Sequence, residues 1–196
     1  MPSGCRGGVF YSYPGPNLLT RRVELSIHPG QTCLALPRIE VGLTISAQAE
    51  WELCYHLSGR IGDLAIPEPA PPVTTDGLWQ HTCCELFVAV RGEEGYREFN
   101  FSPSGAWAHY AFSAYRQRIP WPGDLPAPVI TTRRRDDELT VQVRLAPAFL
   151  PQAAALQVGL TAVVEDRHGA CTHWALAHQG ERPDFHQRST FLLDLP

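Results

Sequence analysis

The chain has 196 residues, of which 44% are hydrophobic and 18% are charged, a composition typical of one folded domain with a sizeable core. Its net charge of −4 disfavours nucleic-acid binding, because nucleic-acid-binding surfaces are basic. All 16 basic residues are arginines, so Schiff-base lysines, pyridoxal phosphate anchors and Walker A lysines are excluded.

Residues 1–17 are rich in Gly, Pro and Ser and predict a flexible tail, which leaves residues 18–196 as a single domain. Within that domain, alternation of apolar and polar residues typical of β-strands recurs along nearly the whole chain. We predict strands at residues 23–28, 39–47, 51–57, 64–66, 79–90, 96–101, 107–115, 129–133, 139–145, 156–164, 171–177 and 190–195. Residues 147–155 are the only helix candidate, with an expected length of one or two turns.

Of these twelve segments, about ten or eleven are expected to form short strands, and their separation by turn signals indicates an all-β protein. No amphipathic helix is present to cover a parallel sheet, so βαβ architecture is disfavoured. The prediction is an antiparallel β-sandwich of jelly-roll type with little helix.

Residues 76–105 predict a hairpin whose two faces differ in character. Side chains alternate between the faces of a strand, so one face of the first strand carries Trp79, His81, Cys83 and Glu85. The opposite face carries Cys84, Leu86, Val88 and Val90. On the returning strand, Phe99 and Phe101 lie opposite Tyr96, Glu98 and Asn100. A face with an indole, carboxylates and an amide suits a polar ligand with flat apolar patches, such as a sugar.

The hairpin sequence DGLWQHTC, with the later YREFNFSPSG and the downstream HWALAHQGERPDFHQRSTFLL, resembles the DOMON-like proteins related to family 9 carbohydrate-binding modules. The likeness covers most of residues 18–195. It implies a β-sandwich and sugar recognition between two tryptophans. The positions that match those stacking indoles are Trp79 and Trp174, and the alternative for each is an ordinary place in the core or on a sheet.

The resemblance also implies roles for polar residues. A glutamate at the position of Glu85 accepts hydrogen bonds from sugar hydroxyls in the sugar-binding relatives, and its alternative is a salt bridge to Arg97 or to another arginine on the sheet. We add Glu98, Asn100 and His81 as further candidate ligand-binding residues. The prediction is therefore a non-catalytic protein that holds a small saccharide.

Two other function classes stay open. DOMON-like relatives divide between sugar and haem ligands, and because Met1 is the only methionine, haem would need ligation by two histidines. The other alternative is a structural or protein-interaction sandwich without a ligand. Catalysis is disfavoured: Glu85 and Glu98 could form a glycosidase pair, but their separation does not follow from the sequence, and no nucleophile elbow is present.

The sequence predicts no metal site, because the eight histidines lack metal-binding spacing. Relatives in the wider family can hold a structural calcium, for which Asp166 and Asp184 are the candidate ligands. However, His81 and Thr82 stand where many sugar-binding relatives carry acidic residues, which disfavours both calcium and sugar binding here.

The six cysteines form no CxxC motif, and those at 54 and 171 are expected to be buried thiols. Neither a secretory leader nor a segment of transmembrane length is evident, which favours a cytoplasmic protein without a membrane partner.

A saccharide cleft has a geometric requirement. Trp79 and Trp174 should lie on the same side of the molecule, both partly exposed, because an empty ligand platform meets solvent. Glu85 should point into the same cleft from its floor. The apolar residues of the hairpin, Leu86, Val88, Phe99 and Phe101, should be buried on the opposite side.

Overall fold

The computed structural model describes residues 19–33, 35, 36, 38–121 and 123–196, so the expected tail at residues 1–17 lies outside the described residues. The described chain is built from antiparallel strands and four short 3-10 turns, which confirms the predicted all-β sandwich. The strands are β1 (Leu19–Ile27), β2 (Arg38–Ile45), β3 (Trp51–Ser58), β4 (Cys83–Val90), β5 (Tyr96–Phe101), β6 (Trp107–Ala114), β7 (Gln117–Ile119), β8 (Val129–Arg134), β9 (Glu138–Leu145), β10 (Leu156–Glu165), β11 (Cys171–Ala175) and β12 (Leu193–Leu195). The 3-10 turns are η1 (Ile61–Asp63), η2 (Leu78–Gln80), η3 (Pro147–Phe149) and η4 (Arg188–Thr190).

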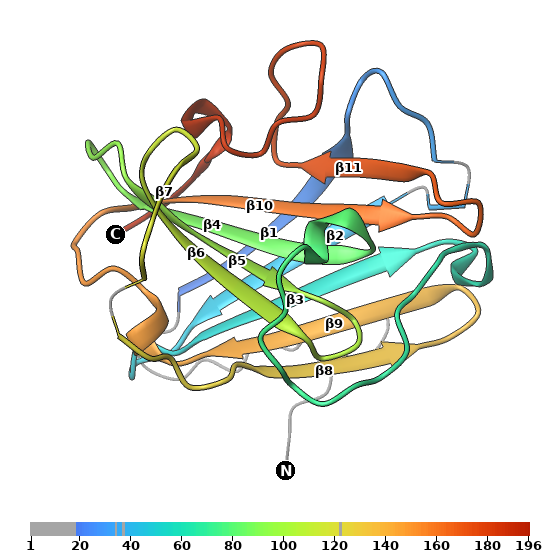
Figure 1. Ribbon diagram of the computed structural model, residues 1–196, viewed down its shortest axis with the longest axis horizontal. Helices are drawn as coiled ribbons and strands as arrows, with labels where there is room; N and C mark the ends of the chain where they lie inside the picture. Colours follow the sequence, from blue (N-terminus) through green and yellow to red (C-terminus); the bar gives the residue numbers. More distant parts are fainter. Residues whose placement is uncertain (1–18, 34, 37, 122) are drawn as a thin grey trace.

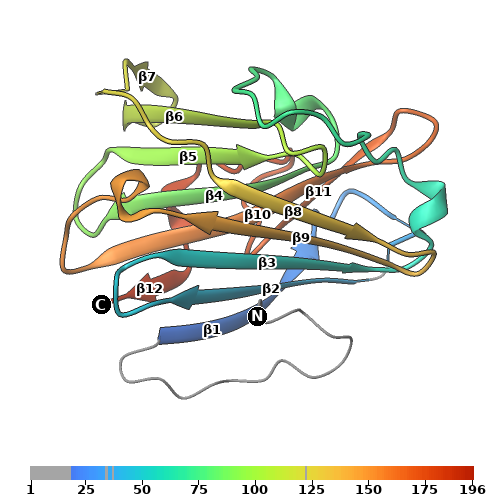
Figure 2. The same cartoon turned by 90° about the horizontal axis from the view of Figure 1, so that it is seen from below.

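The strands form two sheets (Figure 1). The first sheet has the order β1-β2-β3-β9-β8. The second has the order β7-β6-β5-β4-β10-β11, with β12 beside β10. Strand β1 takes part in both, because Ser26 and Ile27 at its end pair with β11 after the rest of the strand has paired with β2. Figure 2 shows β4, β5 and β6 on one side of the molecule and β1, β2 and β3 on the other.

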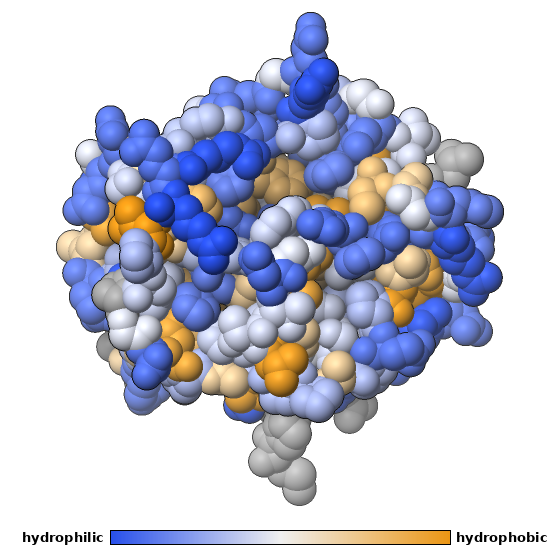
Figure 3. Space-filling view, viewed as in Figure 1, coloured by the Kyte–Doolittle hydropathy of each residue, from blue (hydrophilic) through white to orange (hydrophobic). Residues whose placement is uncertain are grey.

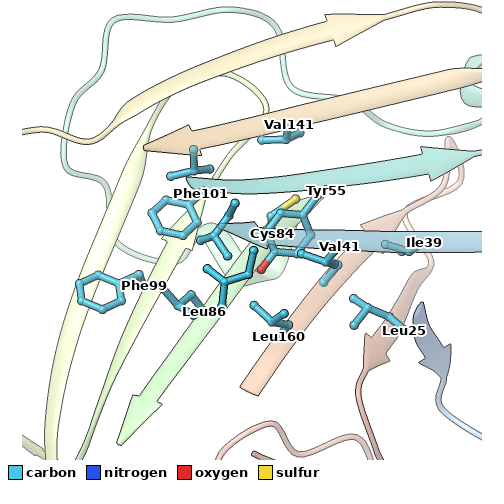
Figure 4. Packing of buried hydrophobic residues seen from close by; sticks show 14 of the residues in the cluster. Leu25, Ile39, Val41, Tyr55, Cys84, Leu86, Phe99, Phe101, Val141 and Leu160 are labelled. Atoms are coloured by element: carbon cyan, nitrogen blue, oxygen red, sulfur yellow. The ribbon is translucent and has the colours of Figure 1, made fainter. Parts of the chain in front are cut away.

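The main core fills the space between the sheets (Figure 4). The hairpin contributes Leu86, Val88, Phe99 and Phe101, all fully buried, which confirms that the apolar face of the hairpin turns inward. Tyr55 of β3 also crosses the core, and its hydroxyl donates a hydrogen bond of 2.5 Å to the backbone carbonyl of Glu85. The period-two alternation of the hairpin therefore decides which side chains remain for the outer face of the second sheet.

The one or two helical turns expected at residues 147–155 are reduced to one. Only the single turn η3 forms there, and Leu150 N–H bonds to the Pro147 carbonyl at 3.1 Å. An α-helix would need the donor four residues after Pro147, but that residue is Pro151, which has no N–H. Residues 64–66 form only an isolated bridge between Leu64 and Asp166, whereas the short strand β7 was not predicted.

The cysteines of the described residues form no disulfide bond. Cys54 is buried as predicted, whereas Cys171 is only half-buried and its thiol donates to the Gln80 carbonyl at 3.6 Å. In the described part of the chain, no helix is both long and apolar enough to cross a bilayer.

Gly159 in β10 allows the segment after η4 to pack closely on the second sheet. A Cβ added there would lie 2.9 Å from Cδ1 of Phe191, a contact too short to persist. Gly159→Ala is therefore expected to lower the free energy of unfolding by about 1–3 kcal/mol, as overpacking of a tight site does. Urea unfolding gives the measurement.

Gly62→Ala is the matched control for Gly159→Ala. The nearest atom to a Cβ at position 62 is a guanidinium nitrogen 3.9 Å away, so its effect should stay within about 0.5 kcal/mol. Equal unfolding midpoints for the two variants would contradict the close packing of Phe191 on β10.

Candidate functional site

A cleft of about 380 Å³ opens on the outer face of the second sheet. Figure 3 shows the side of the molecule that carries η2, where apolar atoms lie in hollows between polar side chains. The cleft is lined by Trp79, Glu85, Phe87, Glu98, Tyr110, Phe112, Arg116, Arg118, Val163, His173, Pro183, Asp184, Phe185 and His186. A site that combines apolar rings with a few convergent polar groups is typical of small-molecule binding.

The floor of the cleft is made by outward-facing residues of neighbouring strands. Strand β4 contributes Glu85 and Phe87, two residues apart and therefore on one face. Strand β5 contributes Glu98, which lies diagonally from Glu85 because β5 pairs Glu98 with Phe87. Strand β6 adds Tyr110 and Phe112. The floor is therefore aromatic, with two carboxyl groups set into it.

Trp79 forms one wall from η2, which contacts β4 and β5 (Figure 1). Gly77 enters this turn with a φ of 79°, a conformation that favours glycine. The indole is 39% exposed and meets the ring of Tyr110 edge-on at 5.7 Å between centroids. The expectation that Trp79 is partly exposed is thus confirmed. Its predicted place within the strand is wrong, because β4 begins only at Cys83.

Another wall of the cleft comes from residues 183–186, which are held in place by Asp184. Its carboxylate accepts hydrogen bonds from the Tyr115 hydroxyl at 2.6 Å, the Arg116 guanidinium at 2.8 Å and the Gln187 amide at 2.9 Å. These bonds hold the pKa of Asp184 below its usual range although burial acts to raise it. Asp184 therefore fixes the wall as a charged anchor.

Glu85 lies in the floor, 2% exposed, at the place the sequence predicted. Its Oε2 accepts a hydrogen bond of 3.0 Å from the Thr161 hydroxyl. Its Oε1 is buried and has no hydrogen-bond partner among the described residues. Burial first, and then the nearby Glu98, raise the pKa of this carboxyl well above its usual range.

Glu98 is 5% exposed and shares the floor with Glu85. The amide of Asn100 donates to its Oε1 at 2.9 Å, and Nε2 of His186 lies 3.7 Å from its Oε2. Burial raises the pKa of Glu98 to about 7. Burial and the adjacent Arg116 lower the pKa of His186 to about 4, so this imidazole is neutral at pH 7 and supplies no counter-charge.

The expected exposure of Trp174 is wrong. This indole is 4% exposed and belongs to the main core, with its N–H donating to the Thr172 hydroxyl at 3.1 Å. The reason is the strand register: Trp174 pairs with Ala162, which in turn pairs with Cys84 on the inward face of β4. Its neighbour His173 takes the outward face and lines the cleft. The two indoles therefore do not face each other across a ligand.

The remaining predicted residues are divided between supporting and outside positions. Asn100 is fully buried beneath Glu98 and is not a lining residue. His81 stands outside the cleft, with its Nδ1 2.8 Å from Oε2 of Glu165. Asp166, one of the two candidate calcium ligands, accepts hydrogen bonds within its own turn from the backbone N–H groups of His168 and Ala170. In the described part of the chain, no three His, Cys, Asp or Glu residues are grouped so as to hold a metal ion.

Several lining residues were not predicted. Simple continuation of the alternation past Glu85 would have added Phe87, and the same pattern on residues 107–115 would have suggested Tyr110 and Phe112. By contrast, the arginines of β7 and its turn and the residues of the 183–186 wall come from irregular segments. No spacing pattern links these residues to the hairpin.

No protein-family model matches the chain, and no curated protein matches it. Two solved structures resemble its fold. One is a candidate carbohydrate-binding protein from Bacteroides uniformis, 14% identical, with a TM-score of 0.57 over 78% of this chain and 76% of that one. The other is a family 9 carbohydrate-binding module from Caldicellulosiruptor kristjanssonii in complex with cellotriose, 12% identical, with a TM-score of 0.52 over 81% of this chain and 75% of that one. These likenesses show that the β-sandwich fold is shared.

Proposed function

We propose that this protein binds a small saccharide in the cleft on the outer face of the second sheet, without catalysis. The observation that carries the proposal is the half-exposed indole of Trp79 standing beside a floor that contains the buried carboxyl groups of Glu85 and Glu98. An indole face packs against the C–H groups of a pyranose, while carboxyl groups bond its hydroxyls. The indole of Trp79 and the polar floor then bind the sugar, in place of the two stacking indoles that the sequence predicted.

The size of the cleft supports the same proposal. A volume of about 380 Å³ is at the small end of the usual range for ligand sites, which suits one or two sugar units. The two structures of similar fold are described as carbohydrate-binding, one with cellotriose bound. The relation to DOMON-like proteins and the cytoplasmic location stay predictions from the sequence.

Trp79→Ala tests the proposal. If the indole is the stacking platform, this variant should lose at least about tenfold in affinity, or 1.4 kcal/mol, for any saccharide that the native protein binds. The measurement is calorimetric titration of sugars chosen from a glycan array. Val129→Ala is the control, because it removes an exposed apolar side chain from β8, in the other sheet. Unchanged saccharide affinity in Trp79→Ala, or no binding to any sugar of the array, would contradict the proposal.

A further inference from the structure

The two carboxyl groups in the floor lack a cationic partner. Oε1 of Glu85 has no hydrogen-bond partner among the described residues, and the basic group beside Glu98 is the imidazole of His186, 3.7 Å away. A buried carboxylate without a hydrogen-bonded counter-charge is costly. The chain contains no lysine that could supply the charge.

The two arginines of the cleft are engaged elsewhere. The guanidinium of Arg116 donates to Asp184 at 2.8 Å, and that of Arg118 lies over the ring of Tyr110 at 4.2 Å from its centroid. Both lower the pKa of Glu98 through space, but less strongly than burial raises it. The floor therefore contains a hydrogen-bond acceptor without a partner. This indicates that a positively charged donor comes from a bound ligand.

We propose that the saccharide which this cleft selects carries a protonated amine, as an amino sugar does, and that Glu85 and Glu98 bind the ammonium group. An ammonium supplies three donors, which can reach carboxyl oxygens on both strands, and it forms charge-assisted hydrogen bonds. The aromatic rings around the floor, Trp79, Phe87, Tyr110 and Phe112, add a surface that also favours a cation. The inference rests on the saccharide function proposed above and names the class of sugar.

Calorimetric titration with glucosamine, N-acetylglucosamine and glucose at pH 6 tests this inference. These ligands share one ring and differ in the charge and the substituent at one carbon. Glucosamine should bind at least tenfold more tightly than both neutral sugars. Glu98→Gln, which keeps the shape and the Asn100 contact but removes the charge, should bring the ratio of affinities close to one. Val129→Ala, on β8 of the other sheet, should leave the ratio of affinities unchanged.

Proton release provides a second readout that needs no variant. Glu98 carries a proton at pH 6 because burial raises its pKa to about 7, so binding an ammonium should release protons into the buffer. Titrations in two buffers of different ionisation enthalpy should show this release for glucosamine and none for glucose.

The outcomes separate the two proposals. Neutral sugars that bind as tightly as glucosamine, with no proton release, would overturn the amine inference and leave the saccharide function standing. Failure of every sugar to bind would overturn both. Tight glucosamine binding that Glu98→Gln leaves unchanged, again without proton release, would also contradict the assigned role of the floor carboxyls.

Discussion

Trp174→Ala is expected to lower the free energy of unfolding by about 3–5 kcal/mol, because it removes a large buried ring from the core and leaves a cavity. The indole is 4% exposed and packs among the residues between the two sheets. Its N–H bond to Thr172 would also be lost, leaving that hydroxyl to find another partner. Urea unfolding followed by circular dichroism measures the change.

Trp79→Ala is the matched comparison, since it removes the same side chain from the cleft wall. With 39% of the residue exposed and no closed cavity left behind, its loss should cost less stability than the loss of Trp174. The pair of variants thus separates a core tryptophan from a ligand platform. A small destabilisation by Trp174→Ala, combined with a loss of sugar affinity, would support sugar binding between Trp79 and Trp174. It would contradict the strand register described above.

The stability of the protein should show two opposing pH dependences that originate in the cleft floor. The carboxyl of Glu98 binds its proton more tightly in the folded protein, where its pKa is about 7, than in an unfolded chain, where it is 4.5. This contribution to stability is present at low pH and is lost as pH rises from about 4.5 through 7. For a raised pKa of this size it amounts to an effect on the order of 3 kcal/mol.

His186 acts in the opposite direction. Its pKa is about 4 in the folded protein and 6.5 in an unfolded chain, so folding is penalised at low pH and the penalty disappears as pH rises from about 4 to 6.5. The two pH dependences of the free energy of unfolding largely cancel in the native protein between about pH 4 and 6.5. The raised pKa of Glu85 adds to the loss of stability toward higher pH.

Single variants should reveal how each group changes the free energy of unfolding with pH. Glu98→Gln should become more stable relative to the native protein as pH rises from 5 to 8, whereas His186→Asn should become less stable relative to the native protein as pH rises from 4 to 6.5. Urea unfolding of the three proteins at intervals of one pH unit gives the comparison. If the free energy of unfolding changed with pH in parallel for Glu98→Gln and the native protein, the pKa of Glu98 would not be raised by folding. That result would contradict the electrostatics described for the cleft floor.

Prediction from the sequence succeeded where one periodicity decides the outcome. Alternation placed Leu86 and Phe99 in the core and Glu85 on the outer face, because a strand offers only two faces. It could not place Trp174, whose face depends on how β11 aligns with β10, a pairing that the local sequence does not encode. A shift of one residue would have exposed the indole and buried His173 instead.

The cleft wall at residues 183–186 lay beyond prediction for a different reason. Asp184 reaches Tyr115 and Arg116 across a sequence separation of nearly 70 residues, and it does so from a segment without regular structure. Contacts of this kind depend on the finished fold. The helical turn expected after residue 147 forms, and Pro151, which has no N–H, prevents its continuation as an α-helix.

Strand β1 has a consequence for how the molecule is assembled. It lies near the start of the chain and pairs with β2 along most of its length, yet its last two residues pair with β11, whose residues 171–175 lie close to the other end of the chain. The seam between the sheets therefore cannot close until residues 171–175 have been synthesised. Contacts between such distant segments are slow to form, because the intervening loop must first be brought together. Until β11 pairs with β1, the chain exposes the unsealed edges of both sheets, and in that interval self-association competes with folding.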